Sequence, residues 1–153
     1  MKIGFAARVR KFAAAVERID TTKLFLQAAA DTSELALNLN RIQLLTQGID
    51  SEGKSLGKYT EATKKKKRAK GQETEFKTMY DTGEFQDAMY LETKKLPIFI
   101  GSKDEKAPIL KKVYGPILGL TKENQADYTK EVLEAYRNKV HHQIENLKDK
   151  ILL

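Results

Sequence analysis

The sequence predicts an α+β fold with N-terminal helices, a long basic loop, a small antiparallel sheet and a long C-terminal helix. Apolar residues recur every three or four positions at both ends of the chain, as in amphipathic helices. Two short runs between these ends have the composition of strands. A chain of 153 residues with 41% apolar content is one domain in length. We therefore expect a single domain, 1–153, made of a helical region (1–47), a basic loop (48–78), a turn with a strand pair and a short helix (79–120), and a C-terminal helix (121–153).

The first 47 residues carry signals for successive helices. Asp20-Thr21-Thr22 provides a cap for a second helix. Asp31-Thr32-Ser33-Glu34 provides a cap for a third helix, or for a continuation of the second, that runs to about Gln47 and is ended by Gly48. The apolar face of the first helix consists of Phe5, Val9, Phe12, Val16 and Ile19. The face expected for the third helix consists of Leu35, Leu39, Ile42 and Leu45, widened by Leu37 and Leu44.

The basic residues are concentrated in one segment. Between Lys54 and Lys70 the chain has eight basic residues and one acid, Glu61, so this segment alone carries +7, which is the net charge of the whole chain. Four glycines and few apolar residues between 48 and 75 indicate an extended loop, with room for a short helix across residues 60–68. The candidate contacts for DNA or for an acidic partner are Lys64, Lys65, Lys66, Lys67, Arg68 and Lys70.

Such a run of lysines neutralises phosphates without regard to base sequence, and binding of this kind weakens as salt rises. No aromatic residue lies between these lysines, so stacking on single-stranded bases is not indicated. A solvated, flexible loop accounts for the same residues equally well, and both interpretations stay open at this point.

A turn signal precedes the strands. Asp81, Thr82 and Gly83 predict a chain reversal, because Asp accepts backbone N–H bonds and Gly adopts positive φ without steric cost. We expect this structural turn to fix a hairpin formed by residues 85–91 and 96–101. A short helix is expected at Ala107–Tyr114. Thr121 is suited to cap the last helix, whose apolar stripe consists of Tyr128, Val132, Tyr136, Val140, Ile144, Leu147 and Ile151.

Three motifs match enzyme or metal sites but lack the setting that those sites need. Residues 48–55 fit the G-x-x-x-x-G-K-S phosphate-binding pattern, but they follow a helix-type segment instead of a buried strand. The triplet 81–83 also occurs in aspartic proteases, which require an almost all-strand body and two carboxylates sharing a proton. His141 and His142 are adjacent, so on a helix they lie about 100° apart and cannot chelate a metal as an i, i+4 pair does.

These observations predict a protein that is not an enzyme, with no catalytic, cofactor-binding or metal-binding residues and no cofactor. The chain has no cysteine, which excludes disulfides and thiolate metal sites. It has no apolar run of about 18 residues, so a membrane is not an expected partner.

Several short motifs follow one another between about residue 35 and residue 150. They are Gly53-Lys54-Ser55-Leu56, Thr63-Lys64, Met79-Tyr80-Asp81-Thr82-Gly83-Glu84-Phe85, Ile100-Gly101-Ser102, the segment Ala107 to Gly115, and Pro116-Ile117-Leu118-Gly119-Leu120-Thr121. Their order and spacing resemble the phage virion morphogenesis, or tail completion, proteins of Mu-like and related tailed phages. The chain departs from that family at Leu56, where Trp is common, and at Lys111, which replaces a common His, so the contacts of those two residues do not carry over.

The resemblance implies a structural virion protein that completes the head-proximal end of the tail and helps head-tail joining. The resemblance implies that copies of the chain form a ring, for which a hexamer is one possibility. The other implied partners are the tail tube or tail terminator, the head connector, and the double-stranded DNA that passes through the ring. Its implied location is the tail or neck of the virion, and the host cytoplasm during assembly. The alternative is a small basic DNA-binding accessory protein that acts through the Lys64 to Arg68 loop.

Overall fold

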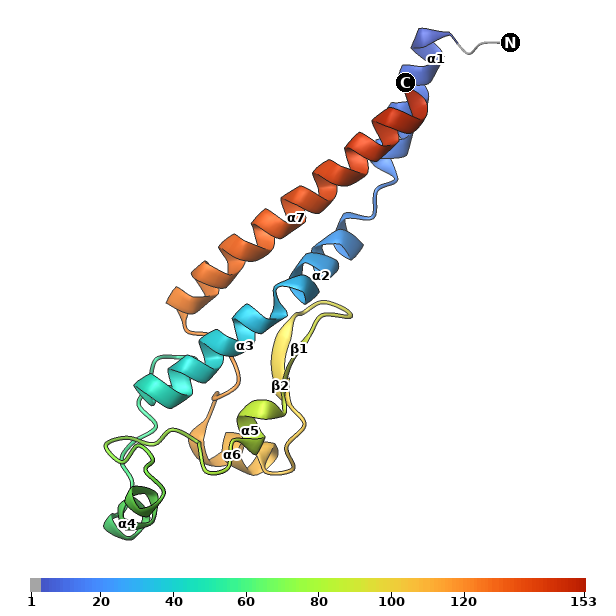
Figure 1. The fold of residues 1–153 in the computed structure, drawn as a ribbon. Coiled ribbons are helices and arrows are strands. Elements are labelled where there is room, and N and C mark those ends of the chain that lie inside the picture. The colour runs from blue at the N-terminus through green and yellow to red at the C-terminus, as the bar shows by residue number, and fades with distance from the viewer. Residues whose placement is uncertain (1–3) are drawn as a thin grey trace. The chain divides into compact units, whose positions relative to one another are not determined.

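The computed structural model describes residues 4–153 and has the α+β architecture that the sequence predicts (Figure 1). Helices precede and follow one small antiparallel sheet, and the last helix is the longest element. The elements are α1 (Phe5–Glu17), α2 (Thr21–Asp31), α3 (Ser33–Ile42), the π-helical turn η1 (Gln43–Gln47), α4 (Glu61–Ala69), α5 (Glu84–Asp87), β1 (Met89–Glu92), β2 (Phe99–Ser102), α6 (Ala107–Tyr114) and α7 (Lys122–Ile151).

The chain divides into two compact units. The first consists of the residues up to Thr32 together with Lys130–Leu153, and the second consists of Ser33–Thr129. The single domain expected over residues 1–153 stays a prediction, and each unit is described by itself below.

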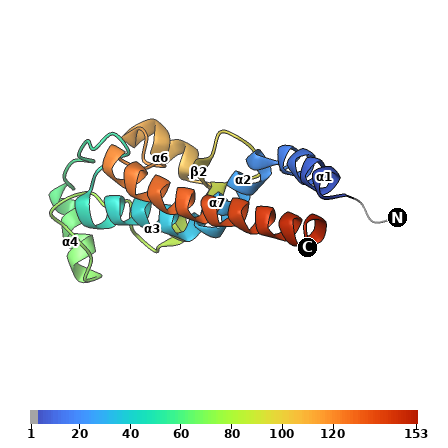
Figure 2. The same ribbon diagram turned by 90° about the horizontal axis from the view of Figure 1, so that it is seen from above.

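The first unit contains α1, α2 and the C-terminal part of α7, and both views show α1 beside the end of α7 (Figures 1 and 2). The capping signal before α2 is confirmed, because the Asp20 carboxylate accepts a bond of 2.9 Å from Lys23 N. Three contacts join the helices: Arg8 Nη1 donates to Leu152 O at 3.0 Å, the ring of Phe25 meets that of Tyr136 edge-on at 5.8 Å, and Lys139 pairs with Asp31 at 2.6 Å.

In the second unit, α3 and η1 form one continuous helical segment that ends where the sequence predicts. Gly48 follows it with φ 61°, a left-handed conformation that glycine adopts without steric cost. The buried face differs from the predicted one, because Ile42 is 48% exposed. The residues that are buried are Ala36, Leu37, Asn40, Gln43 and Leu44. Apolar spacing misplaced this face because two of its members are amides.

The core of the second unit lies between α3, the hairpin and the segments that flank α6. β1 and β2 pair antiparallel, with Met89 opposite Ser102 and Tyr90 opposite Gly101, and α3 packs against β1. The buried apolar residues of this core are Ala36, Leu37, Leu44, Leu56, Phe85, Met89, Ile100, Ala107, Ile117 and Leu120.

The predicted first strand, 85–91, is wrong in its first half. Gly83, with φ 95°, precedes the short helix α5, and the strand begins only at Met89. A helical turn buries the consecutive side chains of Phe85 and Gln86 together, whereas a strand would point them to opposite faces. The second strand is Phe99–Ser102, and the cis peptide bond Leu96–Pro97 lies in the connection. Residues 81–83 therefore precede α5, and residues 93–98 close the hairpin.

The short and long C-terminal helices begin and end close to their predicted bounds. α6 spans Ala107–Tyr114, and Gly115 follows it with φ 78°. Thr121 Oγ1 accepts a bond of 3.3 Å from Asn124 N in the first turn of α7. The predicted stripe is the less exposed side of α7, with Val132 buried. Across residues 4–153 the structure has no helix with the length and apolar character needed to cross a bilayer.

Candidate functional site

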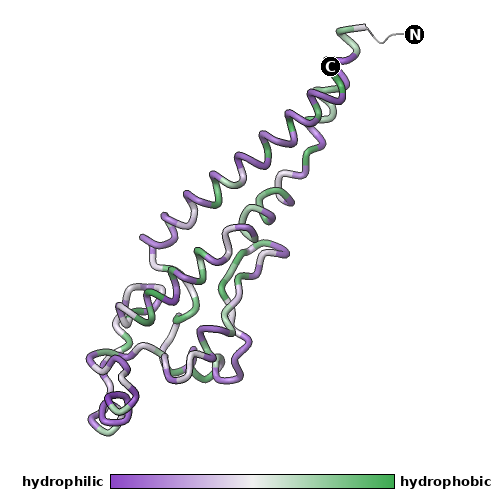
Figure 3. Tube along the Cα trace, in the orientation of Figure 1, coloured by the Kyte–Doolittle hydropathy of each residue, from purple (hydrophilic) through white to green (hydrophobic). Residues whose placement is uncertain are grey.

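The basic segment forms a helix, α4, within the predicted loop. Thr60 has an extended conformation, and its hydroxyl accepts a bond of 3.3 Å from Thr63 N, which caps the helix. Glu61 lies in the first turn and the basic residues lie in the last turn, an arrangement that the helix dipole favours. The whole segment is strongly hydrophilic (Figure 3). Helix propensity, the Thr60 cap and the helix dipole therefore all favour α4, whose nine residues bury no apolar side chain.

Lys67 is the buried residue of α4, with 8% of its surface exposed. Its ammonium donates to Tyr80 O at 2.5 Å and to Gln72 Oε1 at 3.1 Å. The same ammonium lies 4.8 Å from the centre of the Tyr59 ring, within the range of a cation–π contact. Lys67 thus connects α4 to the segment before α5 and is not available to an outside partner.

Two further cations of the basic segment have acidic partners. Lys70 Nζ lies 2.5 Å from Asp81 Oδ1, and Gln72 Nε2 donates to Asp81 O at 2.7 Å. The hydrogen bond and the charge of Lys70 lower the pKa of the Asp81 carboxyl. Lys64 pairs with Glu61 one helical turn away at 2.8 Å, and this contact lowers the pKa of Glu61. Asp81 therefore binds α4, which is a role that the sequence did not assign to it.

Of the six predicted contact residues, Lys65, Lys66 and Arg68 are exposed; Lys66 lines the depression described below, and Lys65 and Arg68 do not. The side chains of all three make no hydrogen bond or ion pair with any residue between 4 and 153. The structure thus divides the basic run into residues that hold the helix and residues that point to solvent.

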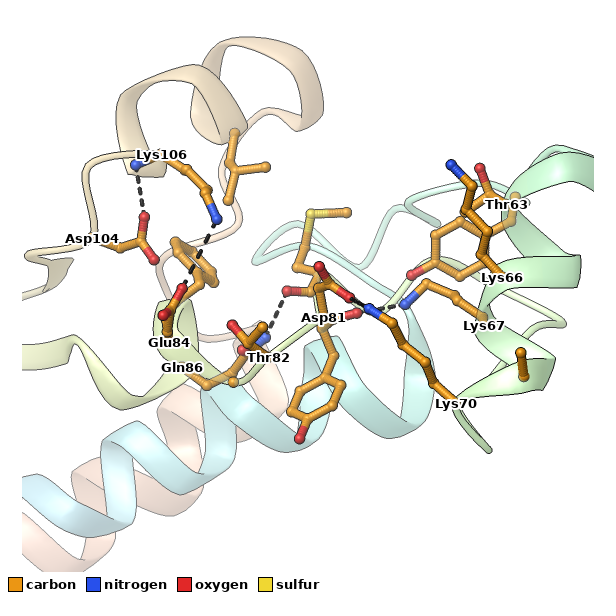
Figure 4. Close-up of a pocket in the computed structure, with 17 residues that line it drawn as sticks. Thr63, Lys66, Lys67, Lys70, Asp81, Thr82, Glu84, Gln86, Asp104 and Lys106 are labelled. Carbon is orange, nitrogen blue, oxygen red and sulfur yellow. Dashed lines mark hydrogen bonds and ion pairs between the residues drawn. The ribbon is translucent and has the colours of Figure 1, made fainter.

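An open depression of about 840 Å³ lies between α4, the segment before α5, and the start of α6. Figure 4 shows Lys66, Lys67 and Lys70 on one side of it, with Asp81 and Thr82 between them and Glu84, Asp104 and Lys106 on the other side. Apolar side chains of Met79, Phe85 and Leu110 also line it.

The charged groups of this depression largely compensate one another. Lys106 Nζ lies 3.9 Å from Glu84, and Asp104 Oδ1 accepts a bond of 2.7 Å from Lys106 N. Asp81 is held ionised by Lys70. No group of three or more potential metal ligands occurs within the described residues. Lys70 with Asp81 and Lys106 with Glu84 thus form two ion pairs at the edge of the depression.

The other two motifs lie on other elements of the chain. In the segment 48–55, Asp50 Oδ1 accepts 2.9 Å bonds from Glu52 N and Lys54 N, so these amides face a carboxylate of the chain itself. The segment follows η1 and opens no helix, which differs from the setting of a phosphate-binding loop. His141 and His142 are both exposed on α7.

Sequence reasoning missed two buried amides that hold a motif of the resemblance. The bonds are Asn40 Nδ2 to Ile117 O at 3.1 Å and to Gly119 O at 2.9 Å, Gln43 Nε2 to Gly119 O at 3.0 Å, and Thr121 N and Asn124 Nδ2 to Gln43 Oε1 at 3.0 and 2.6 Å. Asn40 and Gln43 are three residues apart within an apolar helical pattern, and this spacing is the signal that would have found them.

Comparison of the chain with protein-family models, with curated proteins and with solved structures gives no match. Inference about function therefore starts from the residues and contacts described above. The structure places the motifs of residues 79–121 within one compact unit, and it leaves Lys65 and Arg68 exposed on the side of α4 away from the depression.

Proposed function

We propose that this chain is a structural virion protein of a tailed phage that completes the head-proximal end of the tail and helps join it to the head. The proposal rests on the resemblance of the motif order, and the observation that carries it is the use of those motifs as packing elements. Residues 81–84 line the depression beside α4, whereas Phe85, Ile117 and Gly119 contribute core side chains and backbone bonds.

The packing role is visible in three of the motifs. Phe85, next to the Asp81–Gly83 turn, is a core residue, and Ser102 Oγ donates to Phe85 O at 3.4 Å. Ile117 is fully buried, and the backbone of Gly119 is bound by two amides from the α3–η1 segment. These contacts support a protein whose motifs maintain a shape that other subunits recognise.

Exposed apolar side chains support self-association. On α6, Ile109 is 65% exposed and Val113 is 63% exposed, one helical turn apart. On the hairpin, Leu96 and Phe99 are also exposed, and each strand has one unpaired edge. Two different apolar regions within the second unit fit a head-to-tail contact, in which one edge of a subunit meets another edge of the next and a ring closes.

In this proposal the chain assembles in the host cytoplasm and remains in the tail or neck of the virion. Its partners are further copies of itself, in a ring with a hexamer as the expected form, together with the tail tube or tail terminator and the head connector. It acts as a structural subunit and not as a catalyst.

The test is the mass of the purified protein, alone and mixed with tail tubes, by light scattering and negative-stain imaging. A ring, or decoration confined to one tail end, supports the proposal. Ile109→Ser with Val113→Ser should reduce assembly, and Lys111→Ser with Lys112→Ser on the same helix is the matched control. All four side chains are exposed, so neither pair removes a core contact.

The second candidate is a small DNA-binding accessory protein, and the observation that favours it is the outward cations of α4. A monomer that ignores tails and binds duplex DNA would replace the virion proposal with this one. Ring formation without any effect of the α6 pair would instead move the subunit contact to another surface.

A further inference from the structure

We infer that α4 carries a binding surface for the phosphates of double-stranded DNA, formed by Lys65 and Arg68, and that Lys67 and Lys70 hold this surface in place. This inference does not depend on the virion proposal, since an isolated subunit presents the same helix. It deepens the second candidate function by separating the residues that contact DNA from those that hold the helix. It assigns different roles to residues that form one uninterrupted basic run in the sequence.

The orientation of α4 depends on polar contacts. A helix of nine residues is marginal in water by itself, and α4 buries no apolar side chain that would attach it to the core. The contacts of Lys67 with Tyr80 O and of Lys70 with Asp81 connect the helix to the segment before α5. Because Lys67 and Lys70 occupy the side of α4 that faces the segment before α5, Lys65 and Arg68 lie away from that segment.

The positions of the outward cations destabilise the helix by electrostatic repulsion. Lys65 and Arg68 are three residues apart, so they are neighbours on the helix surface, and like charges at this spacing destabilise a helix. Lys66 lies on the side of the depression with Lys67 and Lys70 and does not belong to this pair. No described acid lies within ion-pair distance of Lys65 or Arg68, although the charge of Arg68 contributes to the lowered pKa of Glu61. An anion bound between these side chains would reduce the repulsion between their charges. Anion binding therefore accounts for this arrangement better than solubility alone.

The exposed face of α4 favours DNA over a protein partner. Protein interfaces depend on buried aromatic or large aliphatic anchors, and the exposed residues of α4 are charged side chains and alanines. Contacts to phosphates require only positioned cations and hydrogen-bond donors. Tyr59 lies under Lys67 and is not free to stack on a base. The surface therefore binds the DNA backbone without reading its sequence.

The experiment is fluorescence anisotropy with a labelled duplex, using the full chain over salt concentrations from about 50 to about 200 mM. Two phosphate contacts give a slope of log affinity against log salt of about −1.8, at about −0.9 for each contact. The double variant Lys65→Gln with Arg68→Gln should lose measurable binding or reduce the slope to near zero. Circular dichroism should show the same helix content and thermal midpoint as the unchanged protein.

The charge-matched control is Lys94→Gln with Lys95→Gln, two exposed residues outside α4. It should retain the salt slope of the unchanged protein. An equal loss in both double variants would overturn the inference, because net charge and not α4 would then govern binding. Absence of duplex binding at the lowest salt would also overturn the inference. This outcome includes the case in which α4 binds an acidic protein instead of DNA.

Light scattering on the same samples separates this inference from the proposed function. Binding by a monomer that forms no ring would leave the α4 surface supported and count against the virion proposal. A ring that decorates tails but does not bind duplex DNA would support the virion proposal and overturn the inference about α4.

Discussion

The side-chain amide of Asn40 binds the backbone of Gly119 in both directions: Nδ2 lies 2.9 Å from Gly119 O, and Gly119 N lies 3.4 Å from Oδ1. This pairing imitates the bonding between two strands. It attaches the end of α3 to the segment that leads into α7, although the two are 79 residues apart in the sequence. Because Asn40 is fully buried, the pairing takes place without competition from water.

Replacement of this amide should destabilise the second unit. Asn40→Ala would leave the backbone groups of Ile117 and Gly119 with fewer partners, and each buried unsatisfied group costs about 1–3 kcal/mol. We expect the free energy of unfolding to fall by at least that amount in urea denaturation. Asn138→Ala, on the exposed side of α7, is the control and should change stability by less than about 0.5 kcal/mol. A loss no larger than that of the control would show that solvent replaces the pairing.

The parts of the fold that follow from local sequence were predictable. Apolar spacing and the caps at Asp20 and Thr121 predict α2 and α7, because a helix repeats every 3.6 residues whatever lies beyond it. The buried face of α3 was predicted incorrectly, since apolar spacing alone gives no reason to bury Asn40. Its burial depends on backbone groups of residues 117–119, which the sequence does not place next to α3.

The positive charge of the candidate site could be predicted from the sequence, but not which of its basic residues are exposed. The basic run is evident in the sequence, and the structure places it on a helix. The division of that run depends on Tyr80 O, which lies 13 residues from Lys67 and accepts a hydrogen bond from its ammonium. A backbone carbonyl carries no sequence signal, so Lys67 could not be distinguished from Lys66 before the structure was known.

The glycine after η1 should tolerate a side chain less well than another glycine in a similar conformation. Gly48 has φ 61°, and a Cβ there would lie 2.4 Å from Phe76 Cδ2 and 3.0 Å from Lys77 O. Gly53 has φ 78° with open space around it. Both alanine variants should incur the cost of a left-handed residue, about 1 kcal/mol, but Gly48→Ala should lower the thermal midpoint further. Phe76→Ala should recover part of the difference, and equal losses at the two glycines would contradict the predicted clash.

The carboxyl group of Asp81 should titrate below its usual range. The hydrogen bond and charge of Lys70 lower its pKa in the folded protein. The stabilisation from this contact is therefore present above the unfolded pKa and is lost as the pH falls through the folded value. In a carbon-detected NMR titration, Lys70→Gln should raise the pKa of Asp81 toward the value of an unpaired Asp. Lys65→Gln is the control and should leave it where it is; an unchanged Asp81 pKa in Lys70→Gln would mean that the pair is not formed in solution.

Lys67 should control the local stability of α4 more than the stability of the whole unit. Lys67→Met removes the donor for Tyr80 O and Gln72 Oε1 while keeping an apolar side chain over the Tyr59 ring. A hydrogen bond from a charged group contributes about 1.5–3 kcal/mol, so native-state hydrogen exchange should show the opening free energy of the α4 amides falling by about that amount. Amides of β1 and β2 should keep their protection, because α4 buries no apolar residue against the core. Lys65→Met is the matched control, since Lys65 has the same side chain on the same helix but faces solvent. If both variants exchange alike, α4 is held by its own propensity and cap, and the role of Lys67 in orienting the outward cations would have to be abandoned.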